Sequence, residues 1–194
     1  SLENPVGVTI NGTPHATVYI IDNDRTAPVP SNQIELNYIG SFDPSGTNNS
    51  TCEIVVHDSA TQRLFTTSAV AGFLDIIDFS DPTMPSVISS VDMNSYGGVT
   101  SVAVKNGIVA VASPNADETQ NGSVVFFDTN GTFLKQVTVG ALPDMITFSP
   151  DGTKVLTANE GQPNTDYSID PEGSVSIIDI SGGIVSLTQA NVTT

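Results

Sequence analysis

Short runs of apolar and β-branched residues recur along the chain, and each run is bounded by Gly, Pro, Asn, Asp or Ser. Three runs close on a similar signature, in which two apolar residues precede an aspartate, at Asp78, Asp128 and Asp179. The aspartates are about 50 residues apart, so the signature marks an internal repeat. Runs of this length and composition predict strands, and no stretch keeps a helical period over about three turns.

Each signature is the third of four apolar runs in its repeat, with two runs before it and one after it. Turns such as Asn106-Gly107 and Asp151-Gly152 separate the runs, because these residues adopt the positive φ that tight hairpins need. Four antiparallel strands in about 40 to 50 residues are the blade of a β-propeller. A β-sandwich is the alternative, but it does not explain a signature that returns three times at constant spacing.

We therefore predict an all-β chain, with a partial β-propeller of about three four-stranded blades and a leading strand at residues 34–40. The propeller segment is expected to cover residues 34–194, with blades at about 51–94, 98–140 and 142–192.

The first 25 residues differ from the repeats. A single apolar run at residues 16–21 ends in Asp22-Asn-Asp24. Residues 26–33 are rich in proline, which cannot pair in the interior of a sheet, and they are expected to form a linker. We therefore place the tail of a separate domain at residues 1–25.

That tail resembles the last two strands of a Calx-beta domain. The resemblance rests on Glu-Asn-Pro-Val-Gly at residues 3–7 and Ala-Thr-Val-Tyr-Ile-Ile-Asp-Asn-Asp at residues 16–24. Calx-beta domains are calcium-binding β-sandwiches of extracellular and adhesive proteins, so the resemblance implies a short hairpin and calcium ligands at Asp22 and Asp24. The alternative is that this aspartate pair forms a turn at the end of the strand.

The repeats resemble the choice-of-anchor I family, a group of secreted or surface-anchored bacterial proteins. The resemblance rests on residues 53–58 with 63–65 and, above all, on Thr157-Ala-Asn-Glu-Gly161 with the acidic stretch 166–175. It implies an extracellular or cell-surface location and a seven-bladed propeller. Three repeats cannot close such a ring, so we expect further blades or a second chain to complete it, as in a fragment or a nicked protein.

The chain carries 21 acidic and only 5 basic residues, for a net charge of −16. Phosphate recognition needs clustered lysine and arginine, and the five basic residues are scattered singly, so we expect no nucleic-acid partner. No apolar run is long enough to cross a bilayer, so we expect no membrane insertion. The single cysteine, Cys52, is expected to be a buried apolar residue at the start of a strand.

The densest acidity lies at residues 159–173, between the second and third runs of the last repeat. Ca²⁺ takes six to eight oxygen ligands from carboxylates, amides and carbonyls. We therefore predict calcium binding by the four carboxylates of this segment, with the amides of Asn159 and Asn164 as neutral ligands; the carboxylates are those of Glu160, Asp166, Asp170 and Glu172. A solvated acidic loop and a catalytic metal site are the alternatives. The equivalent loop one repeat earlier carries Asp117 and Glu118.

The leading function hypothesis is an extracellular or cell-surface binding and scaffold module, stabilised by calcium, whose ligand is a protein, a glycan or a small molecule. The alternative is a metal-dependent phosphatase or phytase-like hydrolase that uses the acidic loop. Against it, no basic cluster is visible to hold phosphate. His57 and Asp58 are adjacent on a strand, so they point to opposite faces and are not expected to form a dyad.

Overall fold

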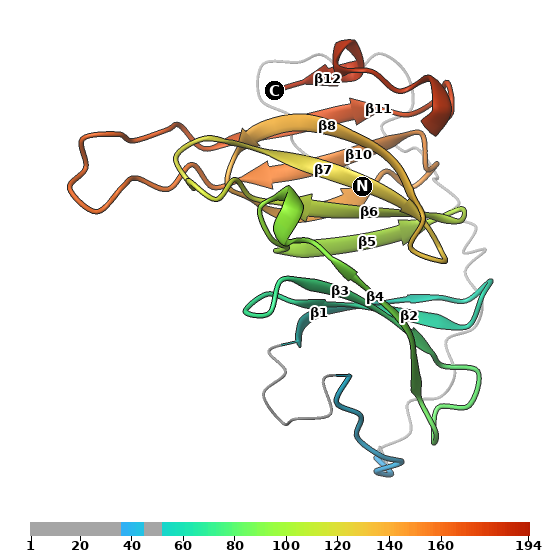
Figure 1. Cartoon of the computed structure of the whole chain (residues 1–194). Helices are drawn as coiled ribbons and strands as arrows, with labels where there is room; N and C mark the ends of the chain where they lie inside the picture. The colour runs from blue at the N-terminus through green and yellow to red at the C-terminus, as the bar shows by residue number, and fades with distance from the viewer. Residues whose placement is uncertain (1–35, 45–51) are drawn as a thin grey trace, which may run out of the picture. The chain divides into compact units, whose positions relative to one another are not determined.

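The computed structural model describes residues 36–44 and 52–194. The chain divides into two compact units, Ser1–Tyr38 and Ile39–Thr194, and all strands of the described residues lie in the second unit. This unit is built from three four-stranded antiparallel sheets, in which each strand pairs with the next one along the chain (Figure 1). The predicted all-β fold is confirmed, and the expected N-terminal hairpin and linker lie outside the described residues.

The first sheet contains β1 (Cys52–Asp58), β2 (Arg63–Ser68), β3 (Phe73–Asp78) and β4 (Ser86–Asp92). The second contains β5 (Ser101–Lys105), β6 (Ile108–Ser113), β7 (Asn121–Asp128) and β8 (Phe133–Ala141). The third contains β9 (Pro143–Phe148), β10 (Lys154–Asn159), β11 (Ser174–Asp179) and β12 (Val192–Thr193). Three short 3-10 helices occur in the connections and near the C-terminus, at Asn94–Tyr96, Ile184–Ser186 and Gln189–Asn191. None of the helices in the described residues could span a membrane.

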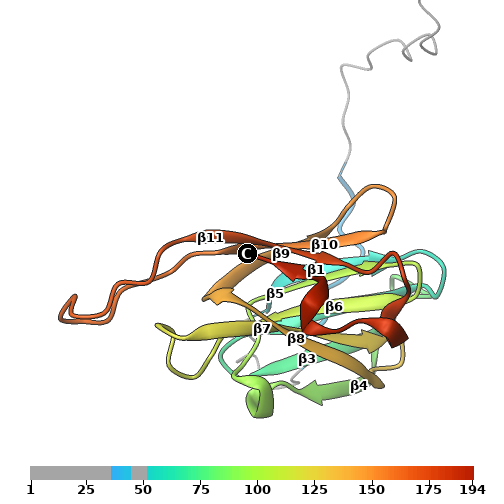
Figure 2. The same cartoon turned by 90° about the horizontal axis from the view of Figure 1, so that it is seen from above.

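The three sheets stack face to face in chain order (Figure 2). Strand β5 contacts both β1 and β9, so the first strands of the three sheets lie side by side. Neighbouring blades of a β-propeller have this arrangement around a central channel.

The three sheets share one register, so positions in one sheet can be equated with positions in the next. In each sheet the signature aspartate is paired with the first residue of the preceding strand: Asp78 with Arg63, Asp128 with Ile108, and Asp179 with Lys154. The repeat seen in the sequence is therefore a repeat of strand pairing.

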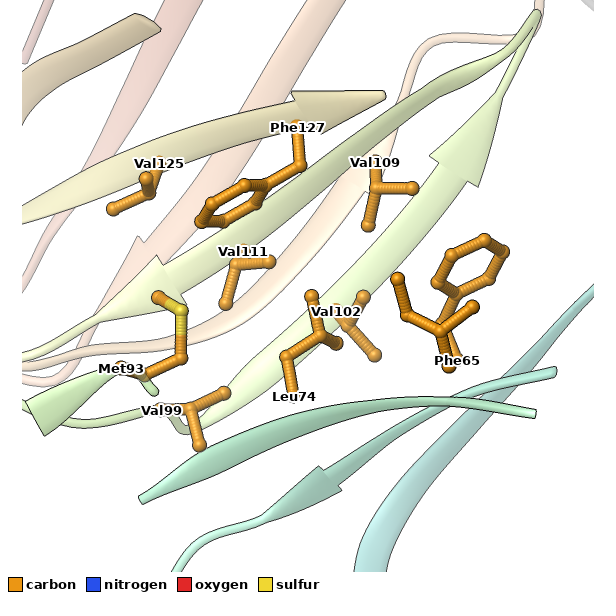
Figure 3. Close-up of a cluster of buried hydrophobic side chains, with 10 residues drawn as sticks. Phe65, Leu74, Met93, Val99, Val102, Val109, Val111, Val125 and Phe127 are labelled. Atoms are coloured by element: carbon orange, nitrogen blue, oxygen red, sulfur yellow. The ribbon is translucent and has the colours of Figure 1, made fainter. Parts of the chain in front are cut away.

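Two apolar cores hold the stack together. The core between the first and second sheets contains ten buried side chains, among them Phe65 and Leu74 from the first sheet and Val111 and Phe127 from the second (Figure 3). The core between the second and third sheets is built around Phe126, with Val155 and Ile178 on the opposite side. Because successive side chains of a strand point to opposite faces, the neighbours Phe126 and Phe127 lie in different cores.

Among the described sheets, only the second has another sheet packed against each of its two faces. The third sheet turns a largely apolar row away from its core, with Met145 51%, Val175 55% and Ile177 39% exposed. The first sheet likewise exposes Val55, which is 59% accessible. These outer faces occupy the same register positions that form the cores inside the stack.

Two expectations are corrected. Residues 36–40, the described part of the expected leading strand, form no strand, because no described strand pairs with them. Cys52 is exposed rather than buried, because β1 is an edge strand that pairs only with β2.

The signature aspartates close turns, as expected. A carboxylate oxygen of Asp78, Asp128 and Asp179 accepts a hydrogen bond from the backbone N–H two residues further on, at 2.9, 2.8 and 2.9 Å. Asp151 does the same with Thr153, at 3.0 Å. Each carboxylate satisfies a backbone donor that would otherwise be left unpaired where the chain reverses.

These hydrogen bonds favour the charged carboxylate. Hydrogen bonds with the side chain and then the backbone of Ser181 lower the pKa of Asp179 to about 2. Hydrogen bonds with the side chain of Ser149 and the backbone of Thr153 lower the pKa of Asp151 to about 2. The ordinary value is 3.8, so the unfolded chain binds more protons than the folded chain between these two values.

We expect acid to destabilise the fold partly through these two turns. Their contribution is complete above the ordinary pKa of 3.8 and is lost as the pH falls towards 2. Urea unfolding between pH 7 and pH 2 should therefore show a shallower loss of stability in Asp151→Asn/Asp179→Asn than in the unchanged chain. Asp144→Asn is the matched control, because Asp144 is an exposed aspartate of β9 outside any turn. An acid profile unchanged by the double substitution would contradict the expectation.

Candidate binding site

Two segments leave the same end of neighbouring sheets. Residues 114–120 connect β6 to β7, and residues 160–173 connect β10 to β11. Figure 1 shows both segments projecting beyond the sheets on the left of the view. They are equivalent connections in consecutive repeats, so the stacking of the sheets brings them next to each other.

A groove of about 680 Å³ lies between the two segments. The shorter segment contributes a run of four residues, Ala116, Asp117, Glu118 and Thr119. The longer segment contributes its outgoing limb and tip, Gln162, Pro163, Asn164, Thr165 and Tyr167. Grooves of this size accommodate small ligands or part of a larger one.

The shorter segment is shaped by its own side chains. Asp117 accepts hydrogen bonds from the backbone N–H of Thr119 at 3.1 Å and from its hydroxyl at 2.7 Å. Asn115 accepts one from the N–H of Asp117 at 3.0 Å and donates one to the carbonyl of Asn121 at 3.2 Å. The next residue, Glu118, is exposed at the groove.

The tip of the longer segment is a tight turn. Asn164 donates from Nδ2 to the hydroxyl of Ser168 at 3.0 Å, and its Oδ1 accepts from the N–H of Ile169 at 3.1 Å. Asp166 accepts from the hydroxyl of Ser168 at 2.7 Å, and hydrogen bonds with the Ser168 side chain and backbone lower the pKa of Asp166. Tyr167 has a φ of +58°, is 75% exposed and lines the groove.

The base of the longer segment is held by Asn159, which is 3% exposed. Its Nδ2 donates to the hydroxyls of Ser174 at 3.1 Å and Ser176 at 2.9 Å, and its Oδ1 accepts from Thr157 at 2.9 Å. A buried amide with its hydrogen bonds satisfied fixes the two ends of the loop. Asn159 therefore has a structural role here, rather than the role of a calcium ligand expected from the sequence.

Gly161 lies next to this network and allows the two limbs to approach each other. Its φ is +65°, and a Cβ at this position would lie 2.5 Å from the carbonyl oxygen of Pro171. The N–H of Gly161 donates to the carbonyl of Ala141 at 3.2 Å, which ties the loop to the end of β8. The Thr157–Gly161 motif thus sets the exit of the loop from the sheet.

The four carboxylates predicted as metal ligands are all exposed and spread along the loop. Glu160 is at its base, Asp166 at its tip, and Asp170 and Glu172 are on the returning limb. None of them lines the groove. Across residues 36–44 and 52–194, no group of three or more His, Cys, Asp or Glu side chains is arranged to hold a metal ion. The calcium site stays a prediction, and Asp22 and Asp24 lie outside the described residues.

Of the calcium ligands predicted in residues 159–173, Asn164 alone lines the groove. The sequence shows Asp117 and Glu118 as an acidic pair in the loop equivalent to 160–173, and this equivalence is the signal that could have indicated that the two loops are neighbours. Gln162, Thr165 and Tyr167 were missed, because uncharged residues in an irregular loop carry no periodic pattern. The groove offers two carboxylates, two side-chain amides and an exposed tyrosine, and no lysine or arginine lines it.

We expect Gly161→Ala to lose more stability than Gly107→Ala. Both glycines have positive φ, of +65° and +79°, but nothing lies within 4 Å of a Cβ built on Gly107. Gly107→Ala should cost about 1 kcal/mol, from backbone conformation alone. Gly161→Ala adds a clash with backbone and should cost at least about twice as much. Urea unfolding measures both, and equal losses would contradict the role given to Gly161.

The fold is similar to solved structures at low sequence identity. Hydrazine synthase from Kuenenia stuttgartiensis is 18% identical, with a TM-score of 0.53 over 68% of this chain and 35% of that one. A putative 6-phosphogluconolactonase from Bacteroides fragilis is 16% identical, with a TM-score of 0.55 over 72% and 37%. Another from Bacteroides uniformis is 14% identical, with a TM-score of 0.53 over 75% and 41%. These likenesses establish the fold alone, and the chain spans well under half of each structure.

No curated protein matches the sequence. The model of the choice-of-anchor I domain, in contrast, matches residues 53–194, which include all three sheets. The match contains the Thr157–Gly161 motif, for which the structure supplies a physical role. The chain belongs to the choice-of-anchor I domain family.

Proposed function

We propose that the chain is part of an extracellular, surface-associated β-propeller that binds a polar, positively charged ligand. The observation that carries the proposal is the groove between residues 114–120 and 160–173. Two loops from neighbouring blades form it, so rigid sheets fix its width. Binding sites on β-rich scaffolds are commonly built in this way, from loops positioned by a framework that does not change.

The charge of the groove selects the ligand class. Asp117 and Glu118 supply two negative charges, and the surrounding chain has a net charge of −16. A cation is attracted by both the local and the overall field, whereas an anion is repelled. The exposed ring of Tyr167 adds a surface on which a cation or the apolar face of a sugar can lie.

The same charge argues against the alternative of a phosphoric ester hydrolase at this groove. Such an enzyme must stabilise the charge of a phosphoryl group in the transition state, by a metal ion or by basic side chains. The groove lining contains no lysine or arginine, and the described carboxylates form no cluster of three that could hold a metal. Ligand binding is therefore the better supported function.

The second part of the proposal concerns the blades that complete the propeller. The outer faces of the first and third sheets occupy the register positions that form the cores inside the stack, and they expose apolar side chains such as Val55 and Met145. We infer that further blades cover both faces and complete the propeller. Burial of each large side chain would then contribute about 1.5 to 3 kcal/mol.

Titration of the purified chain with defined cationic probes tests the binding site. We expect spermine and a glucosamine oligomer to bind at low ionic strength, with an affinity that falls as salt is added. Asp117→Asn/Glu118→Gln should weaken binding about fivefold, and Tyr167→Ala should weaken it to a similar extent. Glu53→Gln is the control, because it removes a charge from β1 outside the groove.

Equal affinity in the groove variants and the Glu53 control would show that only the overall charge attracts the probes, and it would overturn the site.

A second titration, with calcium chloride, tests the predicted calcium site. A rise in the unfolding temperature with calcium that disappears in Glu160→Gln/Asp166→Asn would support the calcium site. An unchanged unfolding temperature would remove it.

A further inference from the structure

The outer face of the first sheet contains a groove of a different kind. Residues 39–44 lie over the sheet and enclose a space of about 310 Å³ against it. The lining is mostly apolar and includes Phe42, Val55, Leu64, Ile77 and Phe79. This is the face that, by register, corresponds to the core-forming faces of the second and third sheets.

One polar pair interrupts this apolar surface. Thr66 of β2 and Asp75 of β3 are directly paired across the two strands, and each is only 6% exposed. Thr66 lines the groove, and its hydroxyl is buried without a hydrogen-bond partner. Asp75 accepts a hydrogen bond from the hydroxyl of Ser90. Within the described residues the one ion pair is Lys154–Asp179, so Asp75 has no cation beside it.

At the equivalent positions of the other two sheets, no buried polar side chain lacks a hydrogen-bond partner. In the second sheet they are Val111 and Val125, which are paired with each other and fully buried in the core. In the third sheet they are Thr157 and Ser176, and both are hydrogen-bonded to Asn159. Among the described sheets, only the first has polar, buried residues at this pair of positions that lack hydrogen-bond partners or have a single one.

Burying a carboxylate that accepts a single hydrogen bond lowers the stability of the fold, and so does burying a hydroxyl that has no hydrogen-bond partner. A group that covers the face and supplies N–H donors would remove both costs. A second copy of this chain does not supply one through the outer face of its third sheet. The row that would face Thr66 and Asp75 there is apolar, with Met145, Val175 and Ile177, and Lys154 is already paired with Asp179.

We propose that the outer face of the first sheet docks a neighbouring strand that carries an arginine or lysine side chain among apolar ones, and that this side chain bonds to Asp75 and Thr66. The apolar stem of such a side chain fits the groove, which Thr66 lines. Its charged end carries several donors, which would bond to Thr66 and to Asp75, the residue paired with Thr66 on the next strand. The inference rests on the proposal that a further blade covers this face, and it specifies the chemistry of that blade.

Substitution of the two equivalent threonines separates an unpaired hydroxyl from a paired one. We expect Thr66→Val to leave the unfolding temperature of the isolated chain unchanged or higher, because it removes a buried polar group without a partner. Thr157→Val should lower it, because it removes the hydroxyl that donates to Asn159. If Thr66→Val lowers the unfolding temperature as much as Thr157→Val, Thr66 is satisfied within the chain and the inference is wrong.

Small probes then test what the groove accepts. n-Butylguanidinium carries an arginine-like end on an alkyl stem, and 1-pentanol is a neutral probe of similar size. In methyl NMR spectra, we expect n-butylguanidinium to shift the signals of Leu64 and Ile77 at about tenfold lower concentration than pentanol. Asp75→Asn, which can still accept the bond from Ser90, should abolish that advantage.

The outcomes distinguish the inference from the proposal on which it rests. Equal binding of the two probes, or an advantage that survives Asp75→Asn, would overturn the basic side chain but leave an apolar blade interface. Binding of neither probe would overturn both the inference and the docking of a blade on this face.

Discussion

Face-to-face packing of apolar sheet surfaces is the interaction on which the rest of this structure depends. A four-stranded sheet has two faces, and in this chain the alternation of side chains places apolar residues on both faces of each sheet. Phe126 and Phe127 show the rule at its simplest, because neighbouring residues of β7 enter two different cores. The second sheet satisfies the rule within the chain, and the outer faces of the first and third sheets occupy the equivalent register positions.

The groove between residues 114–120 and 160–173 is a consequence of the same stacking. Two loops that are far apart in sequence become neighbours because their sheets are neighbours, and side-chain hydrogen bonds shape each loop locally. Asn159 and Gly161 fix where the longer loop leaves the sheet, while Asn164 and Asp166 shape its tip. The groove therefore combines a rigid base with exposed polar side chains, which suits ligand binding more than it suits covalent chemistry.

The sequence predicted what depends on alternation and repetition. The signature at Asp78, Asp128 and Asp179 located the strands and the turns. Each of these carboxylates accepts a hydrogen bond from the N–H two residues further on, so the turn depends only on residues that are close in sequence. The sequence did not predict that Glu160, Asp170 and Glu172 would lie outside the groove lining. The path of an irregular loop depends on contacts between distant residues, such as Gly161 against Pro171. Nor did the sequence reveal Thr66 and Asp75, whose meaning depends on burial and on partners across the sheet.

We infer that each sheet depends on cover for both of its faces. Amide hydrogen exchange of the isolated chain, resolved by residue, tests it most directly, because protection reports the free energy of local opening. The account predicts that the paired amides of β6 and β7 in the second sheet exchange slowest, and that those of β2, β3, β10 and β11 exchange faster. Equal protection of the three sheets, or greater protection of the first or third, would contradict it.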